Sequence, residues 1–234
     1  MYKRILLKLS GEQLQGQFDG GFDAQRAQWI ASELKKVDTN VEIVIMIGGG
    51  NYARGAQLQG NGVQRVTADN IGMLATMMNA LALADVLNAC GVQARPLTNI
   101  KADQVLDQFT HRRALSHLEK KRIVIVAGGT GRPFLTTDTA AVNLALELGC
   151  DAIFKATKVD GVYDSDPAKN PSAKKYESLT LQQAVEQPEI KVMDRAAIAL
   201  AADHGQPIVI FKLLVEGNIV RATRGERVGT TITA

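Results

Sequence analysis

The chain has 234 residues, of which 46% are hydrophobic and 22% charged, and its formal net charge at pH 7 is +3. This composition is typical of a folded globular protein and excludes a disordered chain, and the charge is too small to indicate nucleic acid binding by itself. No uninterrupted apolar run approaches the roughly 18 residues of a membrane span, and the short run after "MYKR" does not predict a signal peptide. Cys90 and Cys150 end apolar helical stretches without metal-binding spacing, so we expect buried free thiols in a cytoplasmic protein.

Short β-type runs alternate with longer helical patterns along the chain. Strands are predicted at residues 4–9, 41–47, 93–97, 122–127, 152–156, 207–212 and 230–233, and helices at 23–37, 70–89, 112–120, 136–148, 180–186 and 195–204. Asp23 is placed to cap the first helix, and Gly149 and Gly205 are placed to end two later ones. This alternation requires crossover connections and predicts an α/β fold, a three-layer αβα sandwich around a mostly parallel, open, twisted sheet. The polar residues 164–175 predict a mobile loop or a seam between two lobes.

Four segments rich in Gly, Ser, Thr or Lys each follow a predicted strand. They are "KLSGE" at 8–12, "GGGNYARG" at 48–55, "GGTGRPFLTTD" at 128–138 and "KATKVDGVYDSDP" at 155–167. Because the carboxyl ends of parallel strands lie at one edge of a sheet, we expect the four segments to converge there. Glycine lacks the Cβ that would keep backbone N–H groups away from an oxyanion, although "GGG" alone is equally consistent with a flexible turn.

The charged residues of these segments suit phosphoryl chemistry. Lys8, Arg54 and Lys158 supply cations, and Asp138 and Asp166 are carboxylates that could hold a lysine or a metal. The sequence contains no Walker A pattern, no H-R-D and D-F-G set of the protein kinases, and no G-x-S-x-G elbow. The segments therefore predict a phosphate cradle that is not a P-loop.

The strings "LLKLSGE", "IGGGNYARG", "GMLATMMNALA", "GTGRPFLTTDTAA", "KATKVDGVYDSDP" and "KVMDRAA" together resemble the bacterial uridylate (UMP) kinase family, of the amino acid kinase superfamily. The resemblance runs from about residue 2 to the C-terminus. It implies the amino acid kinase fold and a reversible phosphoryl transfer from Mg-ATP to UMP, giving UDP and ADP in de novo pyrimidine nucleotide (UTP and CTP) biosynthesis. It also implies one domain, 1–234, in which residues to about 150 bind UMP and form the oligomer interface, and residues 151–234 bind the ATP nucleoside.

The resemblance assigns site residues by position. Those matching ATP contacts are Lys8, Leu9, Ser10, Gly11, Gly50, Arg54, Thr157, Tyr163 and Asp166; those matching UMP contacts are Gly49, Asp69, Thr130, Gly131, Arg132, Pro133, Phe134, Leu135, Thr136 and Thr137. The catalytic group is Lys8, Arg54, Asp138 and Lys158, in which Asp138 organises the lysines. Mg²⁺ is expected to be held mainly by the ATP phosphates, with no resident metal site. Asp194 of "KVMD" receives no role.

Partners and regulation are also implied by the resemblance. Relatives of this kind are homohexamers inhibited by UTP and activated by GTP, with no nucleic acid as primary partner and no membrane. Where an Arg and a His would meet GTP, this chain has Ala84 and Asn88, which leaves GTP activation open. Arg132 and Leu135 replace the Asn and second Phe of the pattern T-G-N-P-F-F-T-T, and Arg132 could approach UMP or face solvent.

Alternative functions stay open at this point. The apolar run "MLATMMNALALADVL" suits either burial or a subunit interface. A kinase of the same fold acting on a carboxylate or carbamate is one alternative, and an oxyanion storage or regulatory protein is another.

Overall fold

The computed structural model describes residues 2–53, 58, 60, 62–165, 167, 169–187 and 193–234. Its centre is a nine-stranded sheet with the order β4-β3-β5-β2-β1-β6-β10-β11-β9. The strands are β1 (Arg4–Leu9), β2 (Glu42–Ile47), β3 (Ala94–Thr98), β4 (Asp107–Gln108), β5 (Ile123–Ala127), β6 (Ala152–Thr157), β9 (Ser178–Thr180), β10 (Ile208–Lys212) and β11 (Thr230–Thr233). All neighbours pair in parallel except β10 and β11, which run antiparallel. The predicted mostly parallel sheet is confirmed.

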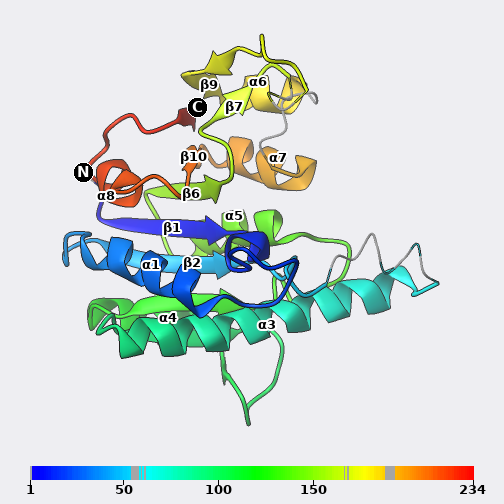
Figure 1. The fold of residues 1–234 in the computed structure, drawn as a ribbon, viewed down its shortest axis with the longest axis vertical. Helices are drawn as coiled ribbons and strands as arrows, with labels where there is room; N and C mark the ends of the chain where they lie inside the picture. The colour runs from blue at the N-terminus through cyan, green and yellow to red at the C-terminus, as the bar shows by residue number, and fades with distance from the viewer. Residues whose placement is uncertain are drawn as a thin grey trace.

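Helices cover both faces of the sheet, which confirms the three layers. One face carries α1 (Ala24–Lys35), α3 (Arg65–Ala89) and α8 (Asn218–Thr223); the other carries α4 (His111–Glu119), α5 (Thr137–Glu147), α6 (Leu181–Glu186) and α7 (Arg195–Asp203). Figure 1 shows α1 and α3 in front of the sheet, with α5 and α7 behind it. Along β2, Ile43, Ile45 and Ile47 pack under one layer while Val44 and Met46 pack under the other. A strand buried on both faces reads as a continuous apolar run, as this one does.

The helix ends follow the predicted signals. The Asp23 carboxylate accepts a hydrogen bond from the backbone N–H of Gln25, which confirms it as the N-cap of α1. Gly149 and Gly205 follow the ends of α5 and α7 with φ of +62° and +61°, the left-handed conformation that glycine adopts without strain. The start of α3 differs, because it begins at Arg65, well before residue 70.

Several short elements escape the sequence patterns. The strands β4 and β9 and the separate antiparallel pair β7 (Val162–Tyr163) and β8 (Lys175–Tyr176) have two or three residues each, too few to show alternation. The polar residues 164–175 lie mainly between β7 and β8, and Asp166 and Ala168 of this segment are outside the described residues.

The two cysteines differ in exposure. Both thiols are free, and Cys150 is buried, where burial raises its pKa to about 12. Cys90 is only half-buried because it lies at the C-terminal cap of α3, so the expectation of burial was wrong for this residue.

Among the helices described, only α3 is long and apolar enough by composition to cross a membrane, and half of its most apolar window is buried in the protein. Burial of this kind is what a core helix of a globular protein shows.

Candidate active site

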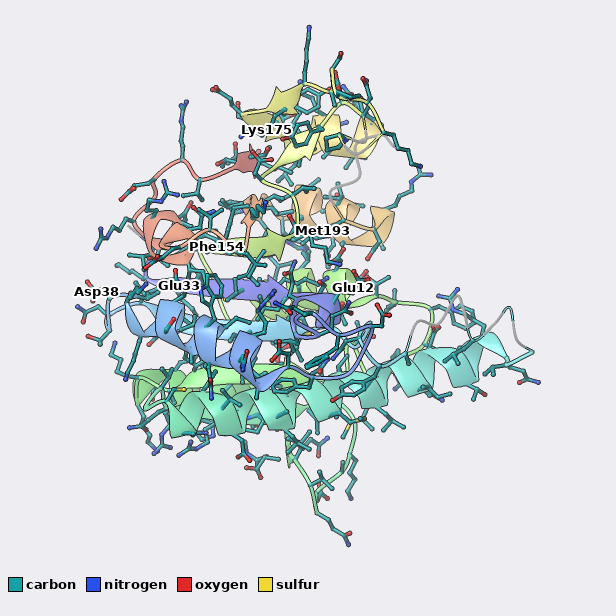
Figure 2. All side chains as sticks on the ribbon, viewed as in Figure 1. Glu12, Glu33, Asp38, Phe154, Lys175 and Met193 are labelled. Carbon is teal, nitrogen blue, oxygen red and sulfur yellow. The ribbon has the colours of Figure 1, made fainter. Side chains whose placement is uncertain are left out.

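The loops after β1 and β2 meet backbone to backbone at the carboxyl ends of the strands. The N–H of Gly48 donates to the carbonyl of Leu9 at 2.8 Å. A Cβ on Gly11 would lie 2.6 Å from the nitrogen of Gly50, closer than any real contact of this kind. Figure 2 labels Glu12 just past the arrowhead of β1, at this edge of the sheet. The convergence of these two glycine segments, expected from the fold, is therefore observed.

A buried amide pair fixes the glycine loop against α3. Asn51 and Asn79 donate to each other's side-chain oxygens at 2.9 and 2.7 Å, and Asn79 also donates to the carbonyl of Gly48. A Cβ on Gly49 would lie 2.7 Å from the carbonyl oxygen of Gly72 on α3. Close packing of the chain against itself is thus a second reason for glycine at positions 48 and 49, besides approach to a ligand.

Two lysines share one carboxylate between the sheet and α5. Lys8 on β1 and Lys155 on β6 are direct neighbours in the parallel register, so their side chains project to the same face. The ammonium of Lys8 lies 2.6 Å from Oδ1 of Asp138, and the ammonium of Lys155 donates to Oδ2 at 2.8 Å. Asp138 is in the first turn of α5, at the positive end of its dipole.

Burial and charge compete in this cluster. Burial raises the pKa of Asp138, but the two lysines outweigh burial and hold it at about 2. Burial lowers the pKa of Lys155, opposed by Asp138 and reinforced by Lys8. Asp138 is therefore ionised throughout the neutral range, and the cluster carries a net positive charge that a phosphoryl group can use.

Asp194, which received no role from sequence, joins two helix starts. It caps α7 by accepting from the N–H of Ala197, and its carboxylate also accepts from the hydroxyls of Thr136 and Thr139 at the start of α5. Thr136 in turn caps α5 through the N–H of Asp138. Asp194 thereby ties the end of the segment 128–138 to the C-terminal part of the chain.

A cavity of about 260 Å³ lies between the glycine loop, α3 and the segment 128–138. Its lining includes Gly49, Gly50, Ala53, Arg65, Ala68, Asp69, Gly72, Met73, Thr76, Gly129, Leu135, Thr136 and Thr137. Of the residues matched to UMP, the structure brings together Gly49, Asp69 and 135–137 in this cavity. The hydroxyl of Thr76 accepts from the N–H of Gly128 at 2.7 Å and so fixes the segment where it leaves β5.

The segment 130–134 carries a turn and a strained residue. The Thr130 hydroxyl bonds to the backbone of Arg132, and the Arg132 residue is exposed. Its contact with UMP stays a prediction. Phe134 has φ of +67°, a conformation that costs a bulky residue roughly 1–3 kcal/mol and persists only where other contacts impose it. Its N–H donates to Oδ2 of Asp69 at 2.8 Å, and the guanidinium of Arg65 lies 5.3 Å from its ring centroid.

The residues matched to the ATP nucleoside lie on the other side of the strand ends. The Thr157 hydroxyl donates to the carbonyl of Val159, and the Tyr163 hydroxyl donates to Asp160 at 2.6 Å. Lys158, assigned from sequence to phosphate stabilisation, lies 3.0 Å from Glu12 with a side chain that is 63% exposed. Arg54 and Asp166 are outside the described residues.

The residue that sequence reasoning missed is Lys155. It occurs in the same "KATK" string as Lys158, and the predicted strand already contained it. Only the pairing of β1 with β6 places it beside Lys8, and nothing local in the sequence indicates that pairing. Asn51 and Asn79 were missed as well, because their pairing depends on how α3 packs on the loop after β2, which no local pattern indicates.

A second cavity lies away from this site. It measures about 710 Å³ and is lined by residues of α1 and of the loops near Phe18 and Leu214, away from the strand-end lysines. Within the described ranges, no group of three His, Cys, Asp or Glu side chains comes together as a metal site.

Comparison with known proteins places this chain in one family. The model of the amino acid kinase family matches residues 3–212. A uridylate kinase of Methylococcus capsulatus is 46% identical over 233 residues, which cover 99% of this chain and 97% of that protein. The solved UMP kinase of Bacillus anthracis superposes with a TM-score of 0.94 at 43% identity, over 99% of this chain and 96% of that one. The UMP kinase of Ureaplasma parvum superposes with a TM-score of 0.93 at 33% identity over 100% of both chains.

Proposed function

The chain belongs to the amino acid kinase family and phosphorylates UMP to UDP, and we propose that the cluster of Lys8, Asp138 and Lys155 stabilises the phosphoryl group in transfer. The observation that carries this proposal is two ammonium groups on one carboxylate at neighbouring strand ends, that of Lys8 buried and that of Lys155 mostly buried. The oxygen of the UMP phosphate attacks the γ-phosphorus of ATP, the bond to the β-phosphate oxygen breaks, and ADP leaves with that electron pair. The attacking oxygen is already ionised at neutral pH, so no protein base is required, and catalysis rests on alignment and charge stabilisation.

Each member of the cluster has a distinct part in this mechanism. Lys8 and Lys155 offset negative charge on the oxygens between donor and acceptor. Asp138 holds the two ammonium groups close together although they repel each other, and its charge opposes the loss of the proton from Lys155. A cluster fixed before substrate arrives needs little reorganisation during the reaction.

We place the two nucleotides on opposite sides of the cluster. UMP occupies the cavity between the glycine loop and α3, with its ribose at Asp69, its base along 130–135, and its phosphate at Thr136 and Thr137, where the N-terminus of α5 favours an anion. ATP lies with its phosphates along Lys8, Leu9, Ser10, Gly11 and Gly50, and its nucleoside near Thr157 and Tyr163. The part to about residue 150 therefore binds the acceptor, and the part from 151 binds the ATP nucleoside, within one domain.

In this mechanism Mg²⁺ is bound by the nucleotide and not by a protein carboxylate. Each oxygen of Asp138 lies against a lysine ammonium, and the positive charges of the two lysines disfavour a further cation at this carboxylate. We therefore propose that Mg²⁺ is held by the ATP phosphates, where it neutralises part of their charge.

We further propose that the enzyme is a cytoplasmic homohexamer that acts in pyrimidine nucleotide synthesis. UTP, which this synthesis forms after UDP, is proposed to inhibit it. The exposed side chains of Ile71, Leu74 and Met78 recur along one face of α3 and suit a subunit contact.

The side-chain amide of Asn88 is engaged in hydrogen bonds to the backbone of Ala84 and Ala94. GTP activation through this helix is accordingly proposed to be absent, and a robust GTP response would contradict that part.

The test is a coupled assay of ADP release with Mg-ATP and with UMP, CMP, AMP or glutamate as acceptor, each with and without GTP and UTP. Turnover on UMP that disappears with EDTA and returns with Mg²⁺ supports the proposal. Turnover on UMP that is indifferent to mutation of Lys155 would refute the assigned mechanism. Size measurement by light scattering tests the hexamer separately.

A further inference from the structure

Arg65 makes two contacts that together join α3 to the loop over the acceptor cavity. Its Nε donates to Oδ2 of Asp69 one turn along the helix at 2.8 Å. Its guanidinium carbon lies 5.3 Å from the ring centroid of Phe134, within the range of a cation–π contact. An exposed ion pair four residues apart is worth little by itself, so the pair does not explain the arrangement. The contacts of Arg65 are explained instead by the position of Phe134.

Phe134 is held in place from α3. The residue is 63% exposed, and its backbone adopts a conformation that a bulky residue avoids. Two contacts restrain it: its N–H donates to Asp69, and its ring lies against the guanidinium of Arg65. Both restraints therefore begin on the first turns of α3, and both depend on the one pair Arg65–Asp69.

This arrangement decides which part of Asp69 faces a ligand. Arg65 and the Phe134 N–H both meet Oδ2, and among the described residues no donor meets Oδ1. Arg65, Asp69 and Leu135, the residue after Phe134, all line the acceptor cavity. Oδ1 is thus available to a donor inside the cavity, such as a sugar hydroxyl, while Oδ2 is used to fix the wall.

We infer that Arg65 is a positioning residue for the acceptor: with Asp69 and Phe134 it forms a latch that fixes the segment 130–136 over the cavity and directs Oδ1 of Asp69 at the ribose. The inference rests on the proposed placement of UMP at Asp69. Arg65 itself acts through Asp69 and Phe134, so its loss weakens acceptor binding and leaves the lysine cluster intact.

The experiment measures kcat, KM for UMP and KM for ATP in Arg65→Ala, Phe134→Ala, the double variant and Arg65→Lys. We expect KM for UMP to rise on the order of 10-fold in Arg65→Ala, which removes both the ion pair and the cation–π contact, and about 3-fold in Phe134→Ala, which removes only the latter. The kcat and the KM for ATP should stay within about twofold of the unmodified enzyme, because the lysine cluster is untouched. Arg224→Ala, which changes an exposed arginine after α8, is the matched control.

Two further variants test whether the residues act as one latch. If they do, the double variant should be no worse than Arg65→Ala. Arg65→Lys should recover part of the loss, since it keeps a charge for Asp69 without the planar stacking.

Two outcomes overturn the latch: an unchanged KM for UMP in Arg65→Ala, or effects of the single variants that multiply in the double variant. Asp69→Asn separates this failure from failure of the proposed function. If Asp69→Asn leaves KM for UMP unchanged, the placement of UMP fails and the latch fails with it. If Asp69→Asn raises KM but Arg65→Ala does not, the placement stands and the latch alone is wrong. Circular dichroism of each variant establishes folding, and Arg65→Lys keeps the test valid if Arg65→Ala does not fold.

Discussion

The side of the strand ends proposed to bind the acceptor and the side proposed to bind ATP are held together by different kinds of contact. On the acceptor side, the amides of Asn51 and Asn79 pair in a fully buried position, and Gly49 packs directly on the backbone of α3. On the ATP side, Tyr163 bonds to Asp160, which also pairs with Lys175, and all three are partly or largely exposed. Burial makes the first set costly to disturb, whereas the second set can exchange its partners for water.

This difference fits the division of labour proposed for the two sides. Electrostatic stabilisation requires groups that are fixed before the reaction, and the lysine cluster is built into the two central strands β1 and β6. The nucleoside of ATP lies far from the bond that breaks and needs only to be bound. The side proposed for it includes the two-residue strands β7 and β8, where Asp160 bonds to Lys175 and Tyr163.

The largest expected effect is a loss of kcat on mutation of Lys155, the first lysine of "KATK", that mutation of the second, Lys158, does not share. Lys155→Ala should lower kcat on the order of 100-fold or more, as Lys8→Ala should, because each removes one charge that stabilises the transferring phosphoryl group. Lys158→Ala is the matched control; it removes an exposed lysine paired with Glu12 and should lower kcat much less. The measurement is steady-state turnover at saturating UMP and ATP. Equal losses for Lys155 and Lys158 would show that burial in the cluster does not decide the role.

The second prediction compares the loss of two hydrogen-bonding side chains, one fully buried (Asn79) and one partly buried (Tyr163). Asn79→Ala leaves Oδ1 of Asn51 and the Gly48 carbonyl without the donor that Asn79 supplies, while Nδ2 of Asn51 keeps its bond to the Gly21 carbonyl. The substitution should therefore lower the free energy of unfolding by about 2 kcal/mol. Tyr163→Phe removes a partly buried hydrogen bond whose acceptor, Asp160, also pairs with Lys175, and should lower the free energy of unfolding by about 0.5 kcal/mol. Urea unfolding of both variants tests the contrast, and similar losses would mean that the two sides are equally held.

The third effect contrasts neighbouring glycines. A Cβ on Gly49 would lie within 2.7–2.8 Å of the Gly72 carbonyl and the Ala75 Cβ, and Gly49→Ala should cost about 1–2 kcal/mol through displacement of α3. A Cβ on Gly50 would have only the Glu12 side chain near it, at 3.8 Å, and Gly50→Ala should leave the melting temperature almost unchanged. Gly50→Ala still raises KM for ATP if the backbone of Gly50 approaches the phosphates. A melting temperature lowered equally in both variants would contradict the packing reason for Gly49.

Buried elements of the fold could be predicted from the sequence, and short exposed ones could not. The central strands and long helices were predicted because burial on both faces leaves long apolar runs and periodic patterns. The strands β7, β8 and β9 have no such pattern, since two or three residues cannot display one. The early start of α3 was missed because its N-cap, Gln64, makes no side-chain capping bond, and so Arg65 was left in a loop.

Site residues in local sequence motifs could be predicted, whereas site residues brought together by long-range contacts could not. The glycine and threonine segments are local in sequence, and their positions followed from the rule that loops converge at strand ends. The partnership of Lys8 with Lys155 depends on the register between β1 and β6, strands separated by most of the chain. The bond from Asp69 to Phe134 likewise joins residues that no local pattern relates.

The smallest expected effect concerns pH and again sets the two sides apart. Burial lowers the pKa of Lys155 below the ordinary 10.5, so as pH rises Lys155 loses its proton earlier than a free lysine would. Because the proposed mechanism uses the charged form, kcat should fall on the alkaline side with an apparent pKa below 10.5. Asp138, with its pKa at about 2, stays ionised through this range and cannot produce the fall. On the ATP side, the hydrogen bond to Asp160 raises the pKa of Tyr163 above 10.0, so its ionisation comes later.

A variant of the same lysine tests the origin of this alkaline fall. An arginine guanidinium keeps its proton up to about pH 12, so the charge beside Asp138 persists in Lys155→Arg. This variant should retain part of kcat, and its alkaline fall in kcat should move to higher pH. The pH profile of kcat for both enzymes is the measurement. A fall that stays in place in Lys155→Arg would assign it to another group and remove the charge of Lys155 from the rate.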